Sequence, residues 1–112
     1  GYYQAYYEIG GVRYCHIIDP ATGSPIRTGA ASVTVVGGSA AENDAYTTAL
    51  SAMGKERAVE FINANLSDRF VIMLFIGDDG GKIITNRPQK ITVDNPDYVL
   101  ANTVLDGKII LN

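Results

Sequence analysis

The segment that decides the fold is SAAENDAYTTALSAMG, residues 39–54. Ser39 and Glu42, three positions apart, form a capping-box pattern, in which each side chain satisfies a free backbone N–H at a helix start. Gly54 follows the last residue of the pattern, and glycine is a common helix terminator. The sequence therefore predicts a helix from Ser39 to Met53.

Strand patterns lie on both sides of this helix, and a second helix follows it. Apolar or β-branched runs bounded by turn residues predict strands, and apolar residues at helical spacing predict the second helix. The predicted strands span residues 6–9, 12–18, 31–36, 69–76 and 80–85, with weaker candidates at 90–94, 98–104 and 108–111, and the second helix spans 55–66. An Asp106-Gly107 turn separates the last two strands. This order predicts an α+β fold, with a mixed, mainly antiparallel sheet and two helices packed on one face.

Composition narrows the class of protein. The chain has 112 residues, with 12 acidic and 9 basic side chains, a net charge of −3 and 46% hydrophobic residues. These values predict one ordered domain over residues 1–112, without the positive charge that nucleic-acid binding requires. The single cysteine, Cys15, excludes an internal disulfide and a site built from several thiolates.

The second predicted strand carries the one histidine of the chain. His16 lies near the end of that strand, on the face shared with Tyr14 and Ile18. Its imidazole could act as a base or a metal ligand near neutral pH, or it could be a hydrogen-bonded residue with a structural role. Asp19 precedes Pro20, and an aspartate there commonly accepts backbone N–H bonds that lock a turn.

The predicted helix has two distinct faces. One face is built from the bulky residues Tyr46, Leu50 and Met53, and the adjoining face from small residues, namely Ala41, Ala45, Thr48, Ala49 and Ala52. Because small side chains permit close approach, we expect Ala45 and Ala49 to lie where the helix meets the sheet.

Asp44 and Thr48 lie one helical turn apart at the margin of the small face. A carboxylate and a hydroxyl are hard oxygen ligands, and Mg²⁺ is often held by one or two protein oxygens plus water and phosphate. The alternative is a threonine bonded back to the helix carbonyls beside a solvated aspartate. Spacing alone leaves both interpretations open.

Two motifs and the strand between them resemble a known family. YCHIIDPATGSP (residues 14–25), the strand SVTVV (residues 32–36) and DAYTTALSAMG (residues 44–54) resemble, in that order, the C-terminal part of the ApbE family of FAD:protein FMN transferases. The family motifs are His-x-x-Asp-Pro-x-Thr-Gly-x-Pro and Asp-Ala-x-x-Thr-Ala-Leu. The resemblance is sharp over residues 14–54 and diffuse to about residue 85.

The resemblance implies an activity. Family members use Mg²⁺ to cleave the pyrophosphate of FAD and join FMN to a threonine or serine of an acceptor protein, and some hydrolyse FAD to FMN and AMP. Carried over by position, Asp44 and Thr48 correspond to Mg²⁺ ligands that also contact the cofactor, and His16 to a histidine that lines the site and assists proton transfer. A non-catalytic ApbE-like binding module is the alternative.

The sequence also departs from the family. Cys15 and Ala21 stand where a second histidine and an arginine are frequent. Because the chain corresponds to the C-terminal part only, we expect the N-terminal FAD-contacting segments to be absent, and the chain alone to be inactive. The chain is then expected to be a fragment of a longer protein, a naturally shortened relative, or a protein in which a second copy or a partner chain supplies the missing half. By resemblance, the protein is expected to be a bacterial lipoprotein anchored outside the cytoplasm.

Overall fold

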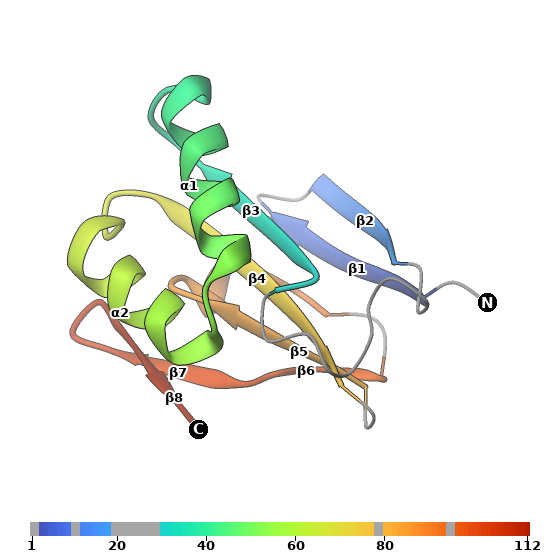
Figure 1. Ribbon diagram of the computed structural model, residues 1–112. Coiled ribbons are helices and arrows are strands. Elements are labelled where there is room, and N and C mark those ends of the chain that lie inside the picture. Colours follow the sequence, from blue (N-terminus) through green and yellow to red (C-terminus); the bar gives the residue numbers. More distant parts are fainter. Residues whose placement is uncertain (1–2, 10–11, 19–29, 78–79, 94–95) are drawn as a thin grey trace.

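The computed structural model describes residues 3–9, 12–18, 30–77, 80–93 and 96–112, the first two ranges by their backbone only. The main sheet has the strand order β3-β4-β5-β6, and Figure 1 shows both helices on one face of it. Its strands are β3 (Ser32–Val36), β4 (Phe70–Gly77), β5 (Gly80–Thr85) and β6 (Tyr98–Leu100), and the helices are α1 (Ala40–Ala52) and α2 (Lys55–Asn65). Neighbouring strands are antiparallel except for the parallel pair β5 and β6. The predicted α+β class, with a mixed and mostly antiparallel sheet, is confirmed.

Two hairpins complete the described structure. Strands β1 (Tyr3–Ile9) and β2 (Val12–Ile18) pair antiparallel, as do β7 (Asn102–Leu105) and β8 (Lys108–Leu111). Asp106 and Gly107 join β7 to β8 with φ angles of 53° and 77°. Two successive positive φ angles are typical of a type I′ hairpin turn, so the predicted Asp106-Gly107 turn is confirmed.

Two strand predictions near the C-terminus were wrong in detail. Residue 90, where a strand over 90–94 was expected to begin, belongs to a short 3₁₀ helix, η1 (Pro88–Lys90), which begins with a proline, and residues 91 and 92 lie in no strand. The strand expected over 98–104 is interrupted at Ala101, whose N–H donates to the Ile83 carbonyl at 2.8 Å. There the chain leaves its pairing with β5 and begins its pairing with β8.

Gly54 does not end α1 in the way glycine usually does. The helix ends at Met53 in an extended conformation, and Gly54, at φ −69°, is the N-cap of α2. Because only these two residues separate the helices, the left-handed turn expected of a terminal glycine is replaced by a direct start of the next helix.

Strand β4 carries the core, because both of its faces are buried. Val71 and Met73 pack in a cluster with Leu50 of α1 and Ile62 of α2. Phe70, Ile72 and Leu74 point to the opposite face and pack with residues that include Ile83, Tyr98, Ile91 and Val93. The helices therefore cover one face of the sheet, and the segment that crosses from β5 to β6 contributes to the cover of the other.

Helix α1 packs with its bulky face, and the expectation that its small face meets the sheet was wrong. Leu50 is fully buried, and Tyr46 and Met53 pack against the same cluster. Ala49 is half-buried, whereas the other members of the small face are exposed, namely Ala41, Ala45, Thr48 and Ala52. Burial of larger apolar side chains removes more apolar surface from water, so the bulky face of α1 is the one that packs against the sheet.

Neither helix of the described residues is long and apolar enough to cross a membrane.

Leu50→Ala should lower the free energy of unfolding by about 2–5 kcal/mol, because it opens a cavity where α1 meets β4. Ala45→Gln, on the exposed side of the same helix, should change it by no more than about 0.5 kcal/mol. Urea unfolding followed by circular dichroism measures both values. Equal effects of the two substitutions would contradict this orientation of α1.

Candidate functional site

Asp44 and Thr48 lie one turn apart on α1, and both are exposed. The Asp44 carboxylate has no hydrogen-bond or ion-pair partner among the described residues. The Thr48 hydroxyl donates to the Asp44 backbone carbonyl at 3.0 Å, and the Thr47 hydroxyl donates to the same oxygen at 2.9 Å. The carboxylate is therefore free to bind a ligand from solvent.

The hydrogen bond of Thr48 corresponds to the structural alternative considered from the sequence, but it does not exclude a ligand role. A threonine hydroxyl has one proton and two lone pairs. Because the proton is directed to the Asp44 carbonyl, the lone pairs remain available to a cation. The described part of the chain holds no group of three or more His, Cys, Asp or Glu side chains that could bind a metal by themselves.

His16 lies in β2, opposite Ala5 of β1 and two residues before the strand ends at Ile18. Its predicted location near a strand end is confirmed. Its side chain lies outside the described part of the structure, as do Asp19 and the predicted turn that follows. The convergence of His16 with Asp44 and Thr48 on one site stays a prediction.

The start of α1 is fixed by the predicted capping box. The Ser39 hydroxyl accepts from the Glu42 N–H at 3.1 Å and donates to the Glu42 carboxylate at 3.1 Å. Hydrogen bonds from Ser39, together with the positive charge of Arg69, hold the pKa of Glu42 below its ordinary value. Asn43 adds a hydrogen bond to the Gly37 carbonyl at 2.5 Å. The two residues before Asp44 are thus bound to the loop that leads into the helix.

Arg69 is a contact of this region that the sequence did not reveal. It lies just before β4, and its side chain is only 9% exposed. Its guanidinium donates to Glu42 at 2.9 Å and to Asp68 at 3.0 Å, and it lies 5.6 Å from the ring centre of Tyr46. Arg69 and Glu42 are 27 positions apart, so no local pattern could have paired them.

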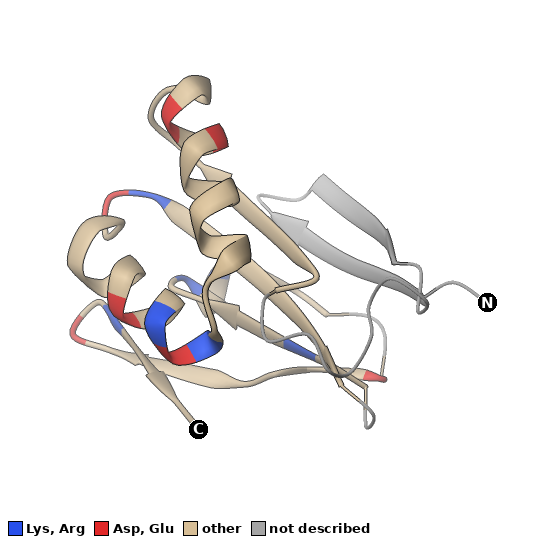
Figure 2. Cartoon of the chain, in the orientation of Figure 1, with Lys and Arg blue, Asp and Glu red and all other residues tan. Residues whose placement is uncertain are grey.

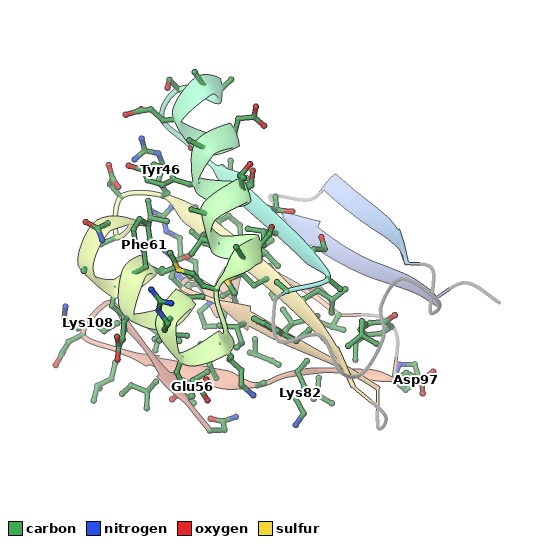
Figure 3. All side chains as sticks on the ribbon, in the orientation of Figure 1. Tyr46, Glu56, Phe61, Lys82, Asp97 and Lys108 are labelled. Carbon is green, nitrogen blue, oxygen red and sulfur yellow. The ribbon has the colours of Figure 1, made fainter. Side chains whose placement is uncertain are left out.

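The described surface also has a pocket of about 330 Å³ at the start of α2. Figure 2 marks positions of charged residues along α2 and β5, and Figure 3 shows the side chains of Glu56 and Lys82 in this region. The lining residues are Lys55, Glu56, Lys82, Val99, Leu100, Ala101, Leu111 and Asn112. None of them belongs to α1, so this pocket is separate from the Asp44–Thr48 pair.

Comparison with known proteins gives the family. The sequence profile of the ApbE family matches residues 1–73. This chain belongs to the ApbE family. The match includes β2, β3 and α1, and therefore all three candidate site residues.

Curated relatives of this ApbE chain are named FAD:protein FMN transferase. The protein from Vibrio cholerae is 45% identical over 82 residues, which are 73% of this chain and 24% of that protein. The protein from Escherichia coli K12 is 47% identical over 62 residues, 55% of this chain and 18% of that protein. The protein from Rhodobacter capsulatus is 41% identical over 85 residues, 76% of this chain and 16% of that protein. The chain thus spans about a quarter or less of these relatives, and no solved structure matches it.

The capping box predicts a pH dependence of stability. Because the pKa of Glu42 is lowered in the folded state, its carboxylate stabilises the fold above the unfolded pKa of about 4.3, and this contribution is lost as the pH falls through the lowered folded pKa. Glu42→Gln should therefore be less stable than the wild type at pH 7, and the difference should shrink below about pH 4.

Urea unfolding between pH 3 and pH 7 measures this difference. Glu60→Gln is the matched control, because Glu60 is an exposed residue of α2. A Glu42→Gln deficit that persists unchanged at the acid end would show that it does not arise from the charge of Glu42.

Proposed function

We propose that this chain is the metal-binding part of a Mg²⁺-dependent flavin transferase, which moves FMN from FAD to a threonine or serine of a partner protein. The observation that carries the proposal is the exposed Asp44–Thr48 oxygen pair on α1, inside the segment matched by the ApbE family. The names of the curated relatives support FAD as the FMN donor and a protein as the acceptor.

The donor set fits Mg²⁺. Asp44 offers a carboxylate without a competing partner among the described residues, and Thr48 offers an oxygen whose proton is already directed away to a backbone carbonyl. Mg²⁺ prefers hard oxygen ligands and commonly keeps one or two from the protein, with water and substrate phosphate completing its octahedron. When bound, Mg²⁺ would neutralise charge on the pyrophosphate oxygens.

In this proposal the three candidate residues have separate roles. Asp44 and Thr48 hold the metal from one helix face, and Asp44 contributes the negative charge. His16 takes the proton from the acceptor hydroxyl, while the hydroxyl oxygen forms a bond to the FMN phosphorus. AMP departs with the electrons of the broken P–O bond. Attack by water at the same phosphorus would give FMN and AMP, which is the hydrolase form of the reaction.

The remaining contacts to FAD have to come from elsewhere. The chain matches about a quarter or less of the length of its relatives, and catalysis of this kind depends on positioning the pyrophosphate. We therefore propose that other segments of a longer polypeptide, a second copy or a partner chain complete the site. A location outside the cytoplasm, as a membrane-anchored lipoprotein, belongs to the same proposal.

A non-catalytic ApbE-like binding module is the second candidate. The backbone hydrogen bond of Thr48 favours it, because this bond is also what a threonine without a ligand makes in a helix. An inactive module would keep the exposed small face of α1 for a partner and would need no metal.

A chimaera separates the two candidates. This chain would replace the matching segment of the Vibrio cholerae relative, and AMP release and protein-bound flavin would be measured with a threonine-containing acceptor peptide, with and without Mg²⁺. Asp44→Asn should lower the Mg²⁺-dependent rate by at least about 100-fold, since several kcal/mol of charge stabilisation would be lost. Thr48→Val should lower it less, because a neutral ligand contributes less to metal binding.

The controls decide between the outcomes. Glu60→Gln in the chimaera should retain full activity, and the 112-residue chain alone should show little or none. Turnover without Mg²⁺, or full activity of Asp44→Asn, would reject the mechanism. Inactivity of the unsubstituted chimaera, with a normally folded protein, would favour the binding module.

A further inference from the structure

We infer that Arg69 is a positioning residue for the Asp44–Thr48 pair, and that it holds the first two turns of α1 in the orientation that presents both oxygens. This inference rests on the proposed function for the role of the pair. The restraint on α1 rests on geometry alone.

The contacts of Arg69 bracket Asp44 along the helix. Its guanidinium donates to Glu42, two residues before Asp44, at 2.9 Å, and it lies 5.6 Å from the ring centre of Tyr46, two residues after Asp44. An ion pair and a cation–π contact with one planar group fix both the distance and the rotation of the helix. The side of α1 opposite Arg69 is therefore set to expose Asp44.

Few other contacts hold this part of α1. The only fully buried residue of α1 is Leu50, which lies near the C-terminal end of the helix. All residues from Ala40 to Ala45 are exposed except the half-buried Asn43. Figure 1 shows the first turns of α1 extending beyond the neighbouring helix. Asn43 binds the loop before the helix through Gly37, and Tyr46 packs against the core with its ring centre 6.0 Å from that of Phe61. Arg69 adds the described ion pair that links these turns to the residue before β4.

Gly38 provides the space in which the guanidinium lies. A Cβ atom on Gly38 would fall 2.3 Å from Nε of Arg69, and Gly38 has a φ angle of 63°. The guanidinium thus packs directly on the backbone of the loop before α1. The Gly37-Gly38 pair thus leaves room for the Arg69 side chain.

Burial of the Arg69 side chain has a free-energy cost that a role in filling space does not explain. Its side chain is 9% exposed, and Nε is buried without a hydrogen-bond partner among the described residues. Burial of a charge with an unmet donor is costly, and an apolar residue of similar volume would fill the space at a lower cost. What an apolar residue cannot supply is the directional bond to Glu42.

The test compares three variants of the chain. Arg69→Met keeps the apolar stem and removes the charge, Arg69→Lys keeps the charge, and Arg57→Met is the matched control. Arg57 is an exposed arginine of α2. Two quantities are measured by NMR, namely amide hydrogen exchange in α1 and in β4–β5, and the Mg²⁺ dependence of the Asp44 and Thr48 amide shifts.

Arg69→Met should speed exchange of the amides of residues 43–48 by about tenfold, with little change in β4 and β5, since local opening of α1 does not require global unfolding. It should also weaken the apparent Mg²⁺ affinity several-fold. Arg69→Lys should restore part of both effects, and Arg57→Met should change neither.

Unchanged exchange in α1, or equal acceleration in α1 and in β4–β5, would overturn the inference, because Arg69 would then be inert or a general contributor to stability. Faster exchange in α1 with unaltered Mg²⁺ affinity would also overturn the positioning role. In the chimaera, an unchanged Mg²⁺-dependent rate on Asp44→Asn would refute the metal role of the pair, and with it the purpose assigned to Arg69, while the exchange data would still report whether Arg69 restrains α1.

Discussion

Burial of β4 on both faces is the constraint on which the rest of the structure depends. Residues 70–74 are at most 3% exposed, so a cover is needed on each side of the sheet. The helices supply one cover, and the crossover between β5 and β6 contributes to the other. This constraint places α1 against β3 and β4, and the candidate residues Asp44 and Thr48 lie on the side of α1 that does not pack on the sheet.

Polar groups in this layered core are satisfied by asparagine side chains. Asn102 is 2% exposed and makes paired bonds of 3.0 Å to the backbone N–H and carbonyl of Thr85, at the end of β5. Asn63 makes the same paired contact with Ile109, at 2.8 and 3.1 Å. In each pair the side-chain amide takes the place of a neighbouring strand, because it offers one donor and one acceptor to a backbone that would otherwise be unpaired. These strand backbones can therefore end in the protein interior without leaving the N–H and carbonyl groups of Thr85 and Ile109 unpaired.

Sequence reasoning succeeded where structure is local and failed where it depends on distant residues. The capping box of Ser39 and the Asp106-Gly107 turn involve neighbouring residues, and their geometry follows from residue type. The orientation of α1 was predicted wrongly, because close approach by the small residues was expected to decide it, whereas the bulky apolar residues pack against the core. The same limit applies to Arg69, whose partner Glu42 is distant in the sequence. The candidate ligands were located because their spacing is helical, whereas the residue that restrains their helix was not.

Exposure of Asp44 and Thr48 is consistent with a metal site that is only half built by this chain. Two protein oxygens on one helix leave most of an Mg²⁺ octahedron to water and phosphate, so the pair has to face open space from which a pyrophosphate can enter. A small-residue surface beside the pair, with Ala41, Ala45 and Ala52 exposed, leaves that approach unobstructed. Bulky apolar side chains at these exposed positions would add little stability through burial, since the face of α1 around Leu50 is the one that packs against the core. The division of α1 into a packed face and an open face would thus keep the proposed ligands accessible to solvent.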